Sequence, residues 1–155
     1  MLESMSQSGF SNWLMQSNSI WAYPTVLTLH TFGMMVLVGC AWVVDLRILG
    51  FGRGIPLKSV GPLITLTWWA FALNAITGTM LFIGDASKRG HDPYFGLKML
   101  LIAAGVATVV LIRRRIDIGG DAPDAVPSSA RTLAVISLVC WFGAITTGRL
   151  LAYVA

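Results

Sequence analysis

The stretch YPTVLTLHTFGMMVLVGCAWVVDLRILG, residues 23–50, decides the fold class of this chain. It has no charged residue before Asp45, and the charge-free run extends back to Ser4. A helix that crosses the hydrocarbon core of a bilayer needs about 20 mostly apolar residues. The stretch is therefore long enough and apolar enough to be a transmembrane helix. One histidine, His30, lies inside it and is the best lead to a function.

Three further segments of the same kind follow and fill most of the remaining chain. Of the 155 residues, 55% are hydrophobic and only 12% are charged. Soluble domains have about 25% charged residues, so this composition argues against a water-soluble domain. The short connections predict an all-α, antiparallel bundle of four transmembrane helices in a single membrane domain. We place the four spans at residues 24–44, 61–84, 93–112 and 132–153.

The residues before the first span, MSQSGFSNWLMQSNS at 5–19, mix aromatic and aliphatic side chains with serine, asparagine and glutamine. This composition is typical of a short interfacial helix on the membrane surface. An extension of the first span is the alternative. The segment lacks a basic n-region, since Glu3 is the only early charge, and it lacks a small-residue cleavage site. We therefore expect it to be retained rather than removed as a signal peptide.

The basic residues are distributed unevenly over the two ends of the predicted bundle. By the positive-inside rule, the end with more lysine and arginine is cytoplasmic. Both termini then face the periplasm, and we expect a multi-pass protein of the bacterial inner membrane. The net charge of +4 indicates anchoring at lipid head groups rather than nucleic-acid binding. The cytoplasmic end would hold Arg47, Arg53, Lys58, Arg113, Arg114, Arg115 and Arg131, and the other end Lys88, Arg89, Lys98 and Arg149.

His30 lies six residues beyond Pro24, roughly 9 Å inside the outer boundary at about 1.5 Å per residue. An ionisable group at that depth is costly unless it is paired or liganded. Gly33 lies on the same helix face and leaves room beside the imidazole for a flat macrocycle or for another helix backbone. His30 would therefore bind a cofactor, or else form a hydrogen bond to a threonine or carbonyl group of a neighbouring helix.

Four other residues are candidates for the same site. His91, the only other histidine, lies in the second loop on the outer side, so two imidazoles could hold one haem iron. The alternative for His91 is a solvated loop residue. A copper ion would combine His30 or His91 with thioether sulfur atoms such as that of Met34. Lys98 and Arg149 would neutralise haem propionates, although Arg149 could equally extend to the interface. The chain has no CxxCH motif, which excludes covalent c-type haem.

Other features indicate packing rather than chemistry. Asp45 and Arg47 mark the cytoplasmic interface in the simplest interpretation, and Cys40 and Cys140 are expected to be buried thiols. Nothing resembles a thiol redox motif, a Walker loop, a nucleophile elbow or a carboxylate dyad, which argues against an independent enzyme. The second span has a stripe of small and polar residues that predicts close helix packing. Its members are Thr67, Ala70, Phe71, Asn74, Thr77 and Gly78.

The pattern HTFGMMVLVG…DLRILG, with FGLKMLLIAAG opening the third span, resembles a family of uncharacterised bacterial inner-membrane proteins. These proteins have four spans, an intramembrane histidine in the first helix and a DLR-x-LG sequence at its inner end. The resemblance covers nearly the whole chain. More distantly, the architecture is similar to the membrane domain of copper-resistance D-type proteins and to small b-type cytochromes, many of which carry more intramembrane histidines. The matching positions are His30, Gly39, Asp45, Leu46, Arg47, Leu49, Gly50 and Lys98.

The leading hypothesis is a membrane protein that binds one b-type haem near its periplasmic side. His30 would be an axial ligand, with His91 or a methionine opposite. The protein would transfer electrons between a quinone or membrane partner and a periplasmic redox protein. A copper or small-solute transport component, and a non-catalytic subunit of a larger membrane complex, are the alternatives. The many small residues in the spans also suggest contacts within a homo-oligomer.

Overall fold

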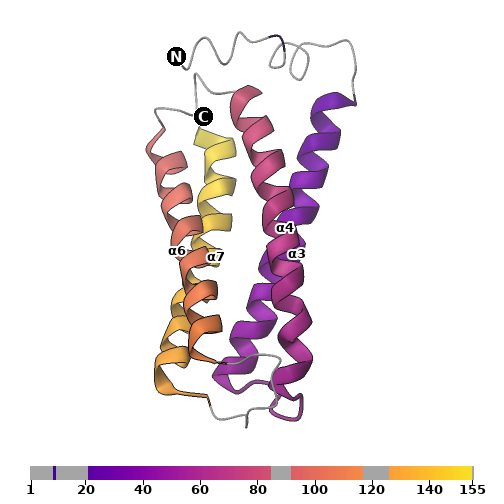
Figure 1. The fold of residues 1–155 in the computed structure, drawn as a ribbon. Coiled ribbons are helices and arrows are strands. Elements are labelled where there is room, and N and C mark those ends of the chain that lie inside the picture. Colours follow the sequence, from indigo (N-terminus) through magenta and orange to yellow (C-terminus); the bar gives the residue numbers. More distant parts are fainter. Residues whose placement is uncertain (1–8, 10–20, 85–91, 117–125, 155) are drawn as a thin grey trace.

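The computed structural model describes residues 9, 21–84, 92–116 and 126–154. Its helices run side by side in alternating directions (Figure 1), which confirms the predicted all-α four-helix fold. Each helix is long enough and apolar enough to cross a membrane, so the fold is that of a multi-pass membrane protein. The helices are α3 (Ala22–Leu49), α4 (Leu57–Gly84), α6 (Pro93–Arg115) and α7 (Ser128–Val154).

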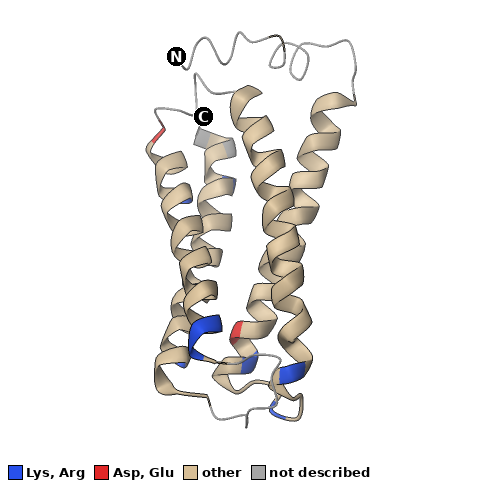
Figure 2. Ribbon diagram, viewed as in Figure 1, with Lys and Arg blue, Asp and Glu red and all other residues tan. Residues whose placement is uncertain are grey.

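Each helix includes the corresponding predicted span and continues beyond it at one end or both. The start of α3 and the end of α7 lie at the same end of the bundle, which we call the terminal end (upper in Figure 1). The opposite end carries most of the described lysine and arginine residues (Figure 2) and is called the basic end. The predicted interfacial segment 5–19, apart from Gly9, lies outside the described residues.

Helix α3 ends at the basic end in a Schellman motif. The φ angle of Gly50 is 103°, in the left-handed region that glycine adopts without a Cβ penalty. The N–H of Gly50 donates to the carbonyl of Arg47 (3.1 Å), and the N–H of Phe51 donates to the carbonyl of Leu46 (3.0 Å). Gly50 is the last residue of the DLRILG sequence, so this motif includes the signal that ends the helix.

Helix α4 begins at Leu57, four residues before the predicted start of the second span at residue 61. Leu57 and Val60 are both buried in the core, and this burial favours an early helix start. Pro62 lies within the second turn, where its missing N–H costs the helix one backbone hydrogen bond. The break between the first two spans is therefore shorter than predicted.

The bundle consists of two helical hairpins. Helix α3 packs mainly against α4, and α6 packs mainly against α7, while α3 and α7 join the two hairpins. Glycines allow close approach within each hairpin. A Cβ atom on Gly33 would lie 2.5 Å from Nδ2 of Asn74, and one on Gly105 would lie 2.9 Å from Cε2 of Trp141. The stripe of the second span serves packing as predicted, since four of its members are buried: Thr67, Ala70, Asn74 and Thr77.

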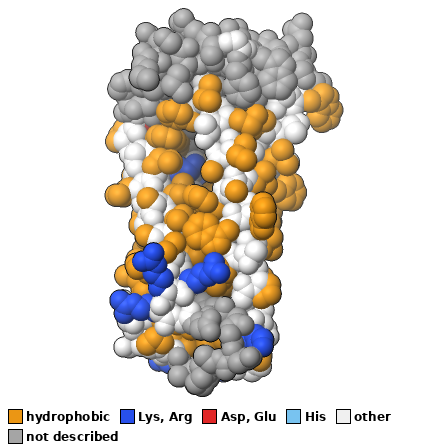
Figure 3. Space-filling view, viewed as in Figure 1, with side chains coloured by type: hydrophobic (Ala, Val, Ile, Leu, Met, Phe, Trp, Pro, Cys, Tyr) orange, Lys and Arg blue, Asp and Glu red, His pale blue; other side chains and the backbone are white. Residues whose placement is uncertain are grey.

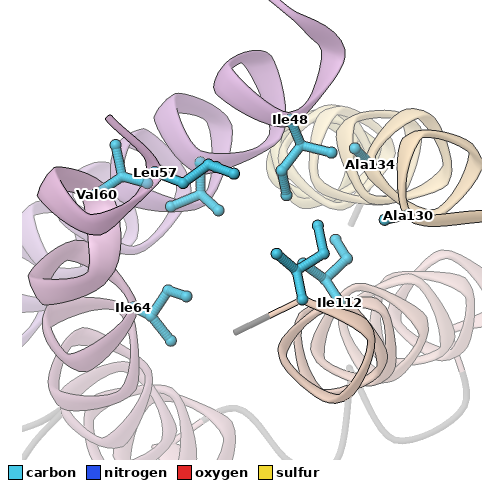
Figure 4. Close-up of a cluster of buried hydrophobic side chains, with 9 residues drawn as sticks. Ile48, Leu57, Val60, Ile64, Ile112, Ala130 and Ala134 are labelled. Carbon is cyan, nitrogen blue, oxygen red and sulfur yellow. The ribbon is translucent and has the colours of Figure 1, made fainter. Parts of the chain in front are cut away.

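Apolar side chains form two buried clusters between the hairpins. The larger cluster lies at the basic end, where Ile48 of α3, Ile64 of α4 and Ile112 of α6 converge with Ala134 of α7 (Figure 4). The side of the bundle visible in Figure 3 is largely apolar, as expected for a surface that faces lipid. The smaller cluster lies in the middle of the bundle and consists of Leu37, Val38, Ala41, Ala70 and Trp141.

Candidate functional site

His30 lies in the terminal half of α3, where its imidazole is half-buried against α4. Its Nδ1 atom is 2.9 Å from the hydroxyl oxygen of Thr77. That hydroxyl is also 2.8 Å from the carbonyl oxygen of Leu73, in a position to donate to it. Both contacts can be hydrogen bonds at once only if Nδ1 carries the proton and donates to Thr77. In that tautomer, Nε2 of the neutral imidazole keeps its lone pair for a metal ion or a proton donor.

Helix α4 occupies the room beside the imidazole. A Cβ atom on Gly78 would lie 3.2 Å from Cε1 of His30, so the ring packs where a larger side chain would crowd it. Gly33 lies one turn further along α3, and the side chain of Asn74 fills the space beside it. Of the two occupants that the sequence allowed at Gly33, a macrocycle or a helix, the structure shows a helix. A ligand of His30 must therefore approach from a side other than that of Gly33 and Gly78.

Lys98 of α6 reaches this region from the other hairpin. It is half-buried, and its side chain crosses Gly148 of α7, where a Cβ atom would lie 3.4 Å from both Cε and Nζ. The ammonium group is close enough to His30 to act on it electrostatically. Figure 3 shows a basic side chain recessed among apolar ones in the terminal half of the bundle. The candidate site thus combines an imidazole from one hairpin with an ammonium from the other.

Buried polar residues lie in the terminal half together with the buried apolar residues Val26 and Leu151. Both apolar clusters of the described residues lie between the level of Leu37 and the basic end. Asn74 and Thr147 are buried in the terminal half. The side-chain Nδ2 of Asn74 donates to the carbonyl of Ala70 (3.0 Å), but its buried Oδ1 has no hydrogen-bond partner among the described residues. A polar interior of this kind is typical of a binding site or a proton path in a membrane protein.

Of the other predicted site residues, Arg149 does not join His30 and Lys98. Arg149 is exposed on α7 and forms no hydrogen bond or ion pair with a described residue. Met34 is half-buried on α3, one turn beyond His30. His91 lies outside the described residues. Among the residues that the structure describes, no three or more His, Cys, Asp or Glu side chains gather where they could hold a metal ion.

The sequence interpretation of Asp45 as a marker of the cytoplasmic interface missed that its side chain is buried. Its side chain is only 2% exposed, and it faces the interior of the bundle near the basic end. The signal was present in the spacing, since Ala41 precedes Asp45 by four residues and Ile48 follows it by three, which places all three on one helix face. The neighbouring Arg47 is also buried, and its Nε donates to the carbonyl of Ile55 in the loop after α3.

The fold and this site define a small multi-pass membrane protein with a polar site between two helical hairpins. The chain belongs to a family of unknown function, DUF6644, whose model matches residues 15–154. This match confirms the part of the predicted resemblance that concerns a family without an assigned function. No curated protein and no solved structure matches the chain. The function must therefore be inferred from the site itself.

Proposed function

We propose that this protein binds one b-type haem in the terminal half of the bundle and transfers electrons through it. One observation supports the proposal above all: the half-buried imidazole of His30 has its Nδ1 engaged by Thr77, and it lies within the electrostatic influence of Lys98. Histidines that ligate metals usually donate their other ring N–H to the protein, which orients the ring. The propionates of a haem are carboxylates, and an ammonium group is a suitable partner for them.

The described residues can supply one axial ligand for the haem, His30, and one partner for a propionate, Lys98. Met34 does not fit the opposite axial position, because it follows His30 by four residues on the same helix face. His91, or a methionine on another helix, is the second ligand in this proposal. The described apolar clusters that join the hairpins lie between the level of Leu37 and the basic end. Separation of the terminal half to admit a macrocycle would leave these clusters intact, but it would break the stacking of Phe82 on α4 against Phe95 on α6, whose ring centroids are 5.0 Å apart.

A bound haem would supply a one-electron redox couple, whose potential depends on its axial ligands and its burial. The chain's own contribution is to orient the His30 ring through Thr77, to neutralise a carboxylate through Lys98 and to keep the site within the membrane. The partners in this proposal are a quinone or membrane protein and a periplasmic redox protein. Seven of the eleven lysine and arginine residues belong to the basic end. This asymmetry supports a bacterial inner-membrane location with both termini in the periplasm.

An absorption spectrum of the protein purified in detergent tests the proposal. We expect a Soret band in the native protein or after addition of haemin, and the loss of that band in His30→Ala. Lys98→Ala should weaken haem binding, whereas Arg149→Ala, which removes an exposed guanidinium, should leave it unchanged. A protein that takes up no haem, or a Soret band that is identical in His30→Ala, would exclude the haem function.

A copper-binding function is the second candidate, and the spacing of His30 and Met34 favours it. Residues four apart on a helix lie on one face, so the imidazole and the thioether could share one Cu(I) ion. The test is metal analysis of the same detergent preparation. Stoichiometric copper that is lost in both His30→Ala and Met34→Leu, without a Soret band, would support this function. If the preparation contained neither haem nor copper, a non-catalytic subunit of a larger complex would be the remaining candidate function.

A further inference from the structure

Asp45 is a buried carboxyl group for which the proposed haem site has no use. Its side chain is 2% exposed, and its Oδ2 has no hydrogen-bond partner among the described residues. The hydroxyl of Ser137 on α7 is close enough to interact with the carboxyl group. The two do not form a hydrogen bond of good geometry, because the fully buried Ser137 Oγ also has no partner in the described part of the chain. One carboxyl oxygen of Asp45 and the adjacent hydroxyl of Ser137 are thus left without a hydrogen bond among the described residues.

A small cavity lies beside this carboxyl group. Its volume is about 10 Å³, close to the smallest space that can hold one water molecule. A second cavity of about 10 Å³ shares Thr67 and Val109 with the first and extends toward Trp141 in the middle of the bundle. The hydroxyl of Thr67 donates to the carbonyl of Leu63 (2.8 Å), and its oxygen can still accept a hydrogen bond. The Asp45 cavity is lined by Ala41, Val44, Asp45, Ile64, Thr67, Val109 and Ile112.

The groups that face Asp45 from the other three helices are neutral. They are Ile64 and Thr67 of α4, Val109 and Ile112 of α6, and Ser137 of α7. The nearest basic residues along α3 and α6 point elsewhere: Arg47 donates to the loop carbonyl of Ile55, and residues 113–115 are exposed.

An ionised carboxylate is unfavourable in this position for two reasons. A buried charge without a partner loses its hydration and usually becomes neutral instead. Asp45 also lies close to the C-terminus of α3, where the negative end of the helix dipole disfavours an anion. Divalent cations need about six oxygen ligands, whereas the described side chains that supply oxygen here belong to Asp45, Thr67 and Ser137. A proton, unlike a divalent cation, can neutralise the carboxylate without a shell of further oxygen ligands.

We propose that Asp45 is a proton-binding site that carries a proton in the bundle and exchanges it with water that reaches the cavity beside it. In the exchange, the carboxylate accepts a proton from a hydronium ion and yields a neutral carboxylic acid and a water molecule, with no change in oxidation state. Ser137 and Thr67 provide oxygen atoms that can accept from the acid directly or through one water in the cavity. This site is separate from His30 and does not depend on haem binding.

Labelling of the purified protein with dicyclohexylcarbodiimide tests the proposal. This apolar reagent adds the O–H of a carboxylic acid across a C=N bond and then rearranges to a stable acylurea, without a leaving group. Mass spectrometry should find the adduct on Asp45 at neutral pH. Above the pH at which Asp45 begins to ionise, the protonated fraction falls about tenfold per pH unit. The yield of the adduct should fall in the same proportion. Asp92, which caps α6 by accepting from the N–H of Tyr94 (2.8 Å), is the internal control and should stay unlabelled.

Two variants and one salt series complete the test. Asp45→Asn should abolish the adduct, and Ser137→Ala should retain it, because labelling requires the carboxyl group and not the hydroxyl. The result on the native protein is decisive even if a variant does not fold. Absence of an adduct on Asp45 at every pH would overturn the proposal. Protection of Asp45 by sodium or potassium at constant pH would also overturn it, because the site would then bind a metal cation.

Discussion

Nδ1 of His30 on α3 and Oγ1 of Thr77 on α4 lie 2.9 Å apart. This contact links the two helices of one hairpin in the terminal half of the bundle, where neither described apolar cluster reaches. It also orients the imidazole, which leaves Nε2 as the atom that can bind a ligand. The stability of the hairpin and the chemistry of the site therefore depend on the same pair of side chains.

Replacement of Thr77 by valine should affect both properties. Valine preserves the shape of the side chain but removes the hydroxyl that contacts Nδ1 of His30. We expect a loss of about 0.6–1.5 kcal/mol in unfolding free energy, as for other interhelical hydrogen bonds in membrane proteins. If His30 binds a metal cofactor, the affinity should fall roughly 10–100-fold. Unfolding in mixed detergent measures the first quantity and cofactor titration the second. Thr77→Ser, which keeps the hydroxyl, is the control, and equal effects of both substitutions would contradict the prediction.

Gly33 should not tolerate alanine. The new Cβ atom would lie 2.5 Å from Nδ2 of Asn74, so that buried side chain must move and lose its bond to the carbonyl of Ala70. Overpacking of this kind costs about 1–3 kcal/mol. Gly39→Ala on the same helix is the matched control, because its Cβ atom would meet nothing within 4 Å. Thermal unfolding in detergent should separate the two variants. Equal stability of the two would show that α3 and α4 are further apart than described.

The second hairpin allows an analogous comparison. Alanine at Gly105 would place a Cβ atom 2.9 Å from Cε2 of Trp141, whose side chain is only 1% exposed, so the indole ring must shift within the core. We expect Gly105→Ala to destabilise the protein by about 1–3 kcal/mol. Gly96→Ala, also on α6, would meet nothing within 4 Å and should be neutral or slightly stabilising through its higher helix propensity. The same thermal measurement applies, and a stable Gly105→Ala variant would refute the described α6–α7 packing.

The orientation in the membrane can be tested with single cysteines. Tyr153 is 80% exposed at the terminal end, and Phe51 is 67% exposed at the basic end. In a background without Cys40 and Cys140, a membrane-impermeant maleimide should label Tyr153→Cys in spheroplasts. Phe51→Cys should be labelled only after permeabilisation, because the positive-inside rule places the basic end in the cytoplasm. The reverse pattern would invert the proposed topology.

The four helices could be predicted from the sequence because each segment satisfies the requirement of the bilayer independently of the other segments. A span must be about 20 residues long and almost free of charge, and these runs are visible without knowledge of their neighbours. The end of α3 at Gly50 is equally local, since it depends on the conformational freedom of one glycine. Helix α4 starts at Leu57 rather than at the predicted residue 61, because the burial of Leu57 and Val60 extends the helix beyond the apolar run.

The sequence by itself determined the fold class, the spans and the importance of His30, because an imidazole in an apolar run is conspicuous wherever the helix packs. Only the tertiary structure decided that Thr77 is its partner, that Asn74 fills the space at Gly33 and that Asp45 is buried beside Ser137. These contacts depend on the rotation and vertical offset of each helix relative to the next. Those quantities arise from the fit of side chains between helices, which no single segment contains.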